Sequence, residues 1–312
     1  MKRWFYGWAV VGVAALAMVG TLPGRTQGLG LITEPLIADL EIDRVTYASL
    51  NFWATLIGAL GALGIGRVID RFGARVVLTL VAGALAVIVG AMSQVTTVAM
   101  LAVCLTATRV VGQGALSVVS IAMIGVWFRA RLNMAMAIYS IALSIGFMAA
   151  FPAVGAMVQG LGWRTAWLAI ALALGAGLAP LAWLVVRRGP EAIGLSRDGG
   201  DIATPEVVPV PADGFTLAEA LATPAFWIFA MGSTLYGLAA SGIGLFNESI
   251  LTERGFGPDV YYQTLAVTAM AGLAGNFLGG WFTRRVALAR LMAIALVVLA
   301  GGVAALPHVS SL

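Results

Sequence analysis

Two arginines occupy long apolar stretches of the sequence, where a charged side chain is costly. Arg25 lies in the stretch 7–38, and Arg109 lies in the stretch 99–127. A charge inside a membrane-spanning helix is unfavourable unless it is paired or faces a wet cavity. A guanidinium group can donate two parallel hydrogen bonds to a carboxylate or a phosphate. Both residues are therefore candidates for binding an anionic substrate.

Polar side chains accompany Arg109 along one face of its predicted helix. At about 100° per residue, they fall within about 80° of one another. This face is expected to contact water or substrate, which makes Gln113 and Ser117 further substrate-binding candidates. The alternative is that Arg109 bonds backbone carbonyls between helices. The polar face consists of Thr106, Arg109, Gln113, Ser117 and Ser120.

Arg25 directly follows Pro23 and Gly24, where the first apolar stretch is expected to bend. Proline removes a backbone donor and disturbs the helix around it. Arg25 therefore has two interpretations of nearly equal weight. It contacts an anionic substrate, or it is a structural arginine that holds the break in the helix.

Two glutamates near the ends of apolar stretches, Glu34 and Glu248, are candidates for proton coupling. Glu34 has a second interpretation as a helix-end residue that pairs with a cation from a loop. Pro35 and Asp39 favour this second interpretation, because they indicate that Glu34 lies close to water.

The stretch 225–251 carries polar residues that share one helical face. Ser233, Tyr236 and Asn247 belong to this face. Tyr236 and Asn247 are candidates for contact with a substrate. Tyrosine and asparagine also join helices to one another inside membranes, which is the alternative role.

The composition is typical of a protein embedded in a membrane. Hydrophobic residues make up 61% of the 312 residues and charged residues only 10%, whereas a soluble domain has about 25% charged residues. The net charge of +4 does not indicate nucleic-acid binding, because the basic residues are confined largely to loops. The expected partners are the lipid bilayer, a small-molecule substrate and protons, and we expect a monomer. Cys104 is the single cysteine, so no intramolecular disulfide is expected.

Enzyme activity is not expected from this sequence. His308 is the only histidine and lies near the end of the chain, so no histidine-based catalytic pair is expected in the membrane. Motifs for zinc hydrolases and phosphate-binding loops are absent from the sequence. We therefore expect no catalytic residues, no metal site and no cofactor.

The apolar stretches predict an all-α membrane protein with nine transmembrane helices. A helical span needs about 20 apolar residues, and the stretch before the first loop is too long for a cleavable signal peptide. The nine stretches are 7–38, 45–68, 76–95, 99–127, 133–160, 165–186, 225–251, 260–282 and 287–306.

The basic residues predict the orientation, because cytoplasmic loops are rich in lysine and arginine. One side of the membrane receives only Arg44, Arg164 and Arg254. The N-terminus is therefore expected in the cytoplasm of a cell with an inner (plasma) membrane. The predicted cytoplasmic set is Lys2, Arg3, Arg67, Arg71, Arg75, Arg129, Arg131, Arg187, Arg188, Arg197, Arg284, Arg285 and Arg290.

A polar segment rich in Pro, Gly and acidic residues separates six predicted spans from three. This composition predicts a flexible cytoplasmic linker. The predicted domains are a six-helix N-terminal bundle at 1–186, the linker at 187–223, and the first three helices of a C-terminal bundle at 224–312.

The sequence also repeats itself at a constant separation of 214 residues. A parallel repeat of this kind is typical of transporters built from two similar halves. The matching residues are Gly28, Gly30, Leu31, Glu34, Tyr47, Gly58, Gly61, Gly66 and Arg71 in the first two spans, and Gly242, Gly244, Leu245, Glu248, Tyr261, Gly272, Gly275, Gly280 and Arg285 in the seventh and eighth.

The loop from Gly66 to Arg75 reads Gly-Arg-Val-Ile-Asp-Arg-Phe-Gly-Ala-Arg. This pattern resembles the signature loop between helices 2 and 3 of the major facilitator superfamily. The Arg109 segment also resembles helix 4 of that superfamily, through its R-x-x-x-Q-G pattern. The resemblance implies the major facilitator fold, with twelve spans in two halves, so the last three helices are expected to be absent from this sequence.

The resemblance also implies a gating role for the loop. Asp70 is expected to pair with neighbouring arginines and with the end of helix 11, and so to latch the cytoplasmic side. Arg71 and Arg75 belong to the same gating loop. Gly66 is expected to let two helices approach closely. Gly73 is expected to permit the turn.

A segment after the sixth span, Arg188-Gly-Pro-Glu-Ala-Ile-Gly-Leu195, is similar to one common in the oxalate/formate and monocarboxylate branch. The position of Arg25 is similar to that of a substrate-binding arginine in the organophosphate antiporter branch. Its repeat mate is Ala239, however, which favours a smaller anion held by one arginine.

These resemblances imply secondary active transport of a small, carboxylate-like organic anion across the inner membrane by alternating access. Efflux of a drug or metabolite by proton antiport is an alternative, although the G-P-x-x-G-G antiporter signature is not matched in the fifth span. A further alternative is a sensor or a truncated remnant that does not transport.

Overall fold

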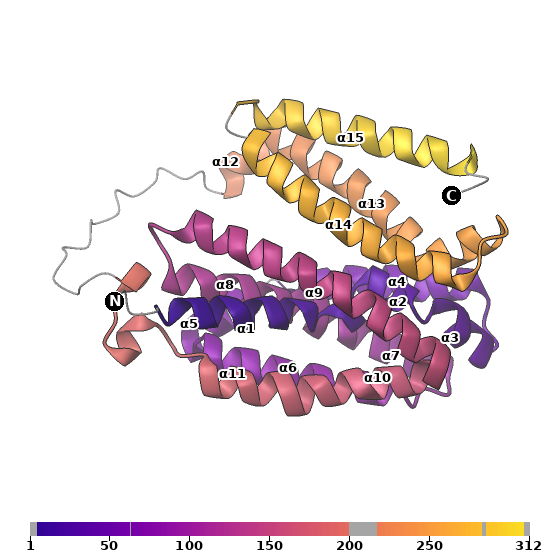
Figure 1. The fold of residues 1–312 in the computed structure, drawn as a ribbon, viewed down its shortest axis with the longest axis horizontal. Coiled ribbons are helices and arrows are strands. Elements are labelled where there is room, and N and C mark those ends of the chain that lie inside the picture. Colours follow the sequence, from indigo (N-terminus) through magenta and orange to yellow (C-terminus); the bar gives the residue numbers. More distant parts are fainter. Residues whose placement is uncertain (1–4, 63, 200–216, 283–284, 309–312) are drawn as a thin grey trace.

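The computed structural model describes residues 5–62, 64–199, 217–282 and 285–308 as an all-helical protein. Helices α1 to α11 and the short turns between them form one packed group (Figure 1). Helices α13, α14 and α15 form a second group beside it. Figure 1 shows the two groups meeting at the end that holds α3 and separating toward the end that holds α12. We call these the α3 end and the linker end.

The first group begins with a broken helix and continues through long helices. Its elements are α1 (Gly7–Val19), η1 (Leu22–Gly24), α2 (Thr26–Gly30), α3 (Thr33–Asp39), α4 (Arg44–Ala62), α5 (Ile65–Phe72), α6 (Ala74–Met92), α7 (Val98–Thr108), η2 (Arg109–Leu116), α8 (Ser117–Trp127), α9 (Leu132–Leu161), α10 (Trp163–Leu172), η3 (Ala173–Leu178) and α11 (Ala179–Val185).

Short turns follow α11, and long helices form the second group. The elements are η4 (Pro190–Ile193), η5 (Arg197–Gly199), α12 (Leu217–Ala222), α13 (Pro224–Thr252), α14 (Pro258–Phe282), α15 (Leu288–Ala305) and η6 (Leu306–His308).

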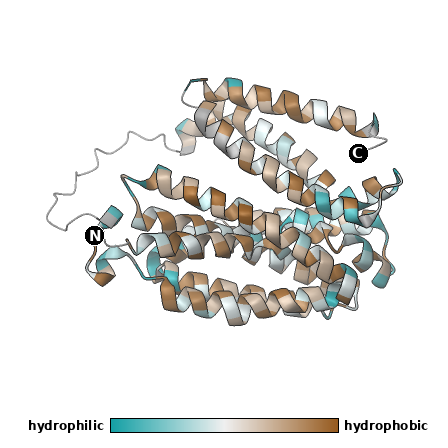
Figure 2. Cartoon of the chain, in the orientation of Figure 1, coloured by the Kyte–Doolittle hydropathy of each residue, from teal (hydrophilic) through white to brown (hydrophobic). Residues whose placement is uncertain are grey.

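Several of these helices are suited to a bilayer. Within the described residues, seven are long and apolar enough to cross a membrane. Figure 2 shows hydrophobic residues along the helices and hydrophilic residues gathered mainly at their ends. The expected all-α membrane fold is therefore confirmed, while the count of nine spans stays a prediction. The seven are Arg44–Phe72, Ala74–Met92, Val98–Trp127, Leu132–Leu161, Trp163–Val185, Pro224–Thr252 and Leu288–Ala305.

The first predicted span is not a continuous helix. Its first helix, α1, has 13 residues, and a 3-10 turn at Leu22–Gly24 separates it from α2. Arg25 adopts an extended backbone with φ −93° and ψ 151°. The expected break at Pro23 and Gly24 is present, because proline cannot donate the backbone hydrogen bond that would continue the helix.

The packed interior lies in the first group. Most fully buried side chains belong to this group, among them Trp127 of α8, Trp167 of α10 and Tyr47 of α4, although Tyr261 of α14 is also fully buried. In the second group, by contrast, α15 has no buried residue among those described. In a bilayer, lipid tails can cover such exposed apolar surface without cost. The domain boundaries at 186 and 223 stay a prediction.

The segment after α11 is attached to the first group through one carboxylate. Asp198 lies in the left-handed region at φ 59° and accepts hydrogen bonds from the backbone amides of Arg129, Ala130 and Arg131, at 2.8 to 3.2 Å. These amides immediately precede α9, where free N–H groups favour an anion. The start of the predicted linker is thus fixed to the turn between α8 and α9.

Candidate functional site at the broken first helix

The break in the first helix leaves backbone groups without a helical hydrogen-bond partner. A side chain from a neighbouring helix supplies a donor to one of them. Arg109 is only 3% exposed, and its Nη1 donates to the carbonyl oxygen of Gly24 at 3.1 Å. The same nitrogen donates to Thr26 Oγ1 at 3.1 Å and to Gln113 Oε1 at 2.7 Å. Nη2 donates to Asn51 Oδ1 at 3.1 Å. One guanidinium therefore joins the helix break to α4 and η2.

Glycines allow the backbones around Arg109 to come this close. A Cβ atom on Gly24 would lie 2.7 Å from the carbonyl oxygen of Thr108, and one on Gly58 would lie 2.8 Å from Cβ of Arg109. Real Cβ atoms do not approach other atoms so closely, so both positions need glycine. The tight contact of η1 and α4 with η2 keeps the guanidinium within reach of all four acceptors.

The helix that carries Arg109 is wound differently from the expected regular α-helix. Residues Arg109–Leu116 form a π-helical segment between α7 and α8. Such segments shift the side chains that follow and are frequent at functional sites. Gln113 is exposed and still bonds Arg109, whereas the Ser117 Oγ atom is buried and has no hydrogen-bond partner within the described part of the chain.

Arg25 directly follows Gly24, between η1 and α2, and its side chain is partly buried. Its Nε donates to Thr21 Oγ1 at 2.7 Å, and its Nη2 lies 2.8 Å from the sulfur of Met18. The guanidinium also stacks 5.1 Å from the ring centre of Phe147 in α9. A thioether is only a weak acceptor, so the donors of Arg25 are incompletely satisfied.

The two guanidinium groups give this region a positive charge. Arg25 is flanked by Gly24 and Thr26, and both of these neighbours accept a hydrogen bond from Arg109. Among the described residues, no carboxylate forms an ion pair with Arg25 or Arg109. Two membrane-buried cations without an acidic partner favour an anion.

The substrate candidates on α13 do not join this cluster through any hydrogen bond among the described residues. Tyr236 is 60% exposed. Asn247 is partly buried, and its Nδ2 donates to Thr264 Oγ1 of α14 at 3.2 Å. This hydrogen bond joins two helices of the second group, which is the alternative role that the sequence allows for Asn247.

Glu34 forms an ion pair at the α3 end. Arg44 donates to both of its carboxylate oxygens, at 3.3 and 3.1 Å, and Ser249 of α13 donates a further hydrogen bond to Oε1. Arg44 also lies 3.9 Å from Glu253. Glu34 thus pairs with a cation as its helix-end interpretation expects, and it also connects the two groups of helices.

The position of Arg44 depends on a cap at the start of α4. Asp43 accepts from the backbone amide and the hydroxyl of Thr46, at 2.8 and 2.7 Å. The hydroxyl bond and the amide bond lower the pKa of Asp43 below its ordinary value. This carboxylate satisfies free amides at the helix start and fixes the direction in which Arg44 leaves the helix.

Repeat mates approach one another at the same end. A Cβ atom on Gly30 would lie 2.3 Å from the carbonyl oxygen of Gly244, so α2 and α13 are in backbone contact. Tyr47 and its mate Tyr261 are both at most 1% exposed. The repeat found in the sequence therefore includes one matching pair, Gly30 and Gly244, that is in contact where the two groups meet.

The gating-loop residues lie at the linker end. Gly73 has φ 81°, which requires glycine. Arg75 donates to the carbonyl oxygen of Trp183 at 2.7 Å and stacks on its ring. Asp70 is exposed, and within the described residues it forms no ion pair or hydrogen bond. Arg71 lies over Phe72, and a Cβ atom at Gly66 would meet open space.

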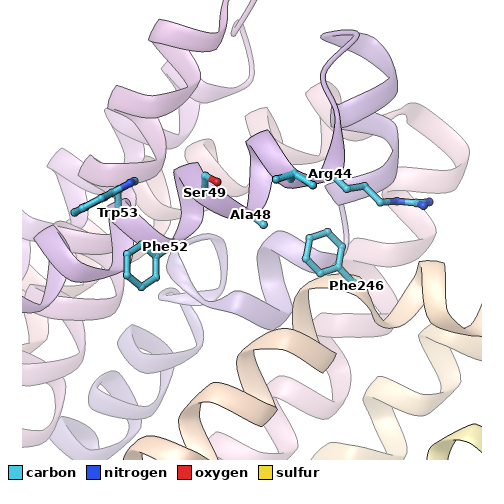
Figure 3. A pocket seen from close by; sticks show the side chains of 7 residues that line it. Arg44, Ala48, Ser49, Phe52, Trp53 and Phe246 are labelled. Carbon is cyan, nitrogen blue, oxygen red and sulfur yellow. The ribbon is translucent and has the colours of Figure 1, made fainter.

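An open groove of about 510 Å³ lies between α4 and α13. Figure 3 shows the rings of Phe52 and Phe246 on its two sides and the Arg44 guanidinium directed away from it. The groove is therefore mainly apolar. Its lining consists of Arg44, Val45, Ala48, Ser49, Phe52, Trp53 and Phe246.

Comparison with known proteins identifies the family. The profile of the Major Facilitator Superfamily matches residues 9–312. The chain belongs to the Major Facilitator Superfamily. This confirms the expected superfamily.

Two relatives illustrate the likeness. An "MFS-type efflux pump" of Mycolicibacterium smegmatis (strain ATCC 700084 / mc(2)155) is 29% identical over 290 residues, which cover 90% of this chain and 63% of the pump. A bacterial homologue of the human lysosomal transporter Spinster, solved in an inward-facing and unoccupied conformation, has a TM-score of 0.69 at 20% identity. That match covers 92% of this chain and 64% of the Spinster homologue. This superfamily member thus spans less than two thirds of either relative.

Some functional residues were missed by sequence reasoning. Thr26 and Asn51 bind Arg109, and Ser249 binds Glu34. Asn51 was the most detectable, because an amide inside an apolar stretch requires a partner. Nothing in the sequence marked Ser249 as a functional residue except its position next to Glu248.

Proposed function

We propose that this superfamily member takes part in secondary active transport of a small, carboxylate-like organic anion across the inner membrane by alternating access. The observation that carries the proposal is the pair of membrane-buried guanidinium groups at the helix break, neither of which has a carboxylate partner among the described residues. A carboxylate would satisfy the free donors of Arg25 and offset the charge.

Arg25 is the proposed anion contact, and Arg109 holds the frame around it. The two terminal nitrogens of Arg109 donate to four acceptors of the protein itself, while its buried Nε has no partner among the described residues. Arg25 relies on a hydroxyl and a thioether. Gln113 is exposed next to Arg109 and is proposed to line the path, together with Ser117, Tyr236 and Asn247. This assignment separates a substrate contact from a positioning residue.

Arg25→Gln is expected to weaken uptake of a carboxylate. Loss of a charge-assisted hydrogen bond costs about 1.5–3 kcal/mol, or roughly a 10- to 100-fold loss of apparent affinity. The measurement is uptake of radiolabelled formate, oxalate and lactate into proteoliposomes. Arg290→Gln is the matched control, because this arginine is exposed and lies in α15. Equal uptake by both variants would exclude the anion assignment.

Efflux of a lipophilic compound is the second candidate function. The aromatic groove of Figure 3 favours it, as does the relative described as an efflux pump. Loss of dye efflux from cells in Phe246→Ala, combined with unchanged anion uptake, would favour efflux. A sensor that does not transport would bind a carboxylate without moving it.

Protons are the proposed coupling ion, with Glu34 and Glu248 as candidate carriers. The loop around Asp70 is the proposed gate of the cytoplasmic side. In the predicted orientation, the α3 end faces the outside and the linker end faces the cytoplasm. A proton gradient imposed on the same proteoliposomes tests the coupling directly.

A further inference from the structure

Two hydroxyl groups form a buried polar cluster against α1, on the helix that leads to the break. Tyr139 of α9 is 3% exposed, and Ser120 of α8 is fully buried. The Ser120 hydroxyl donates to the carbonyl oxygen of Ala14 at 2.7 Å and lies 3.1 Å from the Tyr139 hydroxyl. Three helices therefore meet at these two hydroxyl groups.

The direction of the hydrogen bonds follows from the number of protons. A serine hydroxyl has one proton, and Ser120 gives it to Ala14. The Tyr139 hydroxyl must therefore donate to Ser120, and its own oxygen keeps unused capacity to accept. A neutral hydroxyl is a weaker acceptor than a carboxylate. The proton of Tyr139 would therefore find a better partner in an anion.

Arg25 reaches back along α1 into the same region. Its Nη2 lies 2.8 Å from the sulfur of Met18, while its Nη1 has no hydrogen-bond partner among the described residues. Met18 follows Ala14 by four residues, or about 6 Å along the helix axis. Arg25 and Tyr139 are close enough to interact electrostatically. A free guanidinium nitrogen and a phenolic hydroxyl thus lie beside one turn of α1.

A carboxylate fits this separation. One oxygen atom that accepts two hydrogen bonds of about 2.8 Å joins donors that lie roughly 5–6 Å apart. The ring of Phe147 covers one face of the Arg25 guanidinium, with its centre 5.1 Å away. Because the N–H groups point outward from the edge of the guanidinium plane, stacking on its face leaves these donors available to an anion.

We propose that the Tyr139 hydroxyl is a second donor of the anion site and that a substrate carboxylate binds between it and Arg25. The inference rests on the proposed function, which places the carboxylate at Arg25. In the empty site, Tyr139 donates to Ser120. When the carboxylate enters, the hydroxyl turns from Ser120 to a carboxylate oxygen, and no proton changes owner. Ser120 therefore competes with the substrate for the hydroxyl of Tyr139.

This competition predicts opposite effects for two small substitutions. Tyr139→Phe removes only the donor, so we expect it to weaken carboxylate binding about 3- to 10-fold. Ser120→Ala removes the competing acceptor, so we expect it to strengthen binding about 2- to 10-fold. A cluster that only joins helices would respond differently, because loss of either hydroxyl would then leave binding unchanged or weaken it.

The measurement is equilibrium binding of radiolabelled formate, oxalate and lactate to the purified protein in detergent micelles. Tyr6→Phe is the matched control, because Tyr6 also loses a hydroxyl that makes one hydrogen bond, to the carbonyl oxygen of Val185 at the linker end. Its affinity for the carboxylate should equal that of the parental protein. Thermal unfolding of each variant confirms that it is folded. Ser120→Cys, whose sulfur is a weaker acceptor, serves as a second variant if Ser120→Ala does not fold.

Arg25→Gln separates failure of this inference from failure of the proposed function. If Arg25→Gln loses affinity while Tyr139→Phe binds as tightly as the parental protein, the role of Tyr139 is overturned and the anion assignment of Arg25 stands. A folded Ser120 variant that binds no more tightly than the parental protein would also overturn the competition. If the parental protein binds none of the three carboxylates, the proposed function fails and the inference fails with it.

Discussion

Arg109→Ala is expected to destabilise the protein by about 2–4 kcal/mol, with a corresponding fall in unfolding temperature. The substitution removes all the hydrogen bonds that join the helix break at Gly24 to Asn51 of α4 and Gln113 of η2. It leaves buried acceptors without donors and creates a cavity. The measurement is thermal unfolding in detergent, followed by loss of tryptophan fluorescence or monodispersity.

Arg109→Lys separates charge from geometry. Lysine keeps the positive charge but has no planar fork with which to reach acceptors on four elements, η1, α2, α4 and η2. We expect it to recover less than half of the lost stability. If Arg109→Ala were as stable as the parental protein, Arg109 would have no structural role, and direct contact with substrate would become the better interpretation.

Gly30→Ala is expected to prevent closure of the α3 end and to reduce the proposed transport at least tenfold, because alternating access would require closure in each cycle. The added methyl group would lie 2.3 Å from the carbonyl oxygen of Gly244, and backbone cannot move aside as a flexible side chain can. The helices α2 and α13 must therefore separate. Two measurements check this result. One is uptake into proteoliposomes, and the other is the distance between spin labels attached through Ala38→Cys and Gly257→Cys in a Cys104→Ala background.

The chain offers graded controls for this substitution. At Gly244, a Cβ atom would lie 3.5 Å from the flexible side chain of Gln27, so Gly244→Ala should have a small effect. At Gly242, which is also in α13, a Cβ atom meets nothing within 4 Å, so Gly242→Ala should be neutral. Equal effects of all three substitutions would contradict the contact argument.

Composition and loop motifs were sufficient to predict the class of fold. An apolar chain must satisfy its backbone internally, which leaves helices as the natural choice for long apolar stretches. The loop Gly66–Arg75 and the Arg109 segment then indicated the superfamily, which the family comparison confirmed. The resemblance of residues 188–195 to the oxalate/formate branch has no support beyond the sequence itself.

The site was only partly predictable. Pro23 and Gly24 marked the helix break, because proline acts locally through its own backbone. The partners of Arg109 depend on which helices cross it, and Asn51 lies 58 positions away in the chain. The π-helical segment at Arg109–Leu116 also changed the spacing that a regular helix would give to Gln113 and Ser117.

Local chemistry in the sequence thus determined that the chain forms apolar helices, where the first one breaks, and which charges lie in the membrane. The tertiary structure decided what each charge meets. In the folded chain, Arg109 donates to four acceptors and Glu34 pairs with the cation Arg44. Glu248 is the repeat mate of Glu34, but its Oε2 atom has no hydrogen-bond partner among the described residues. The reason is physical: hydrogen bonds and ion pairs act over a few ångströms, and only the crossing of helices brings distant residues within that range.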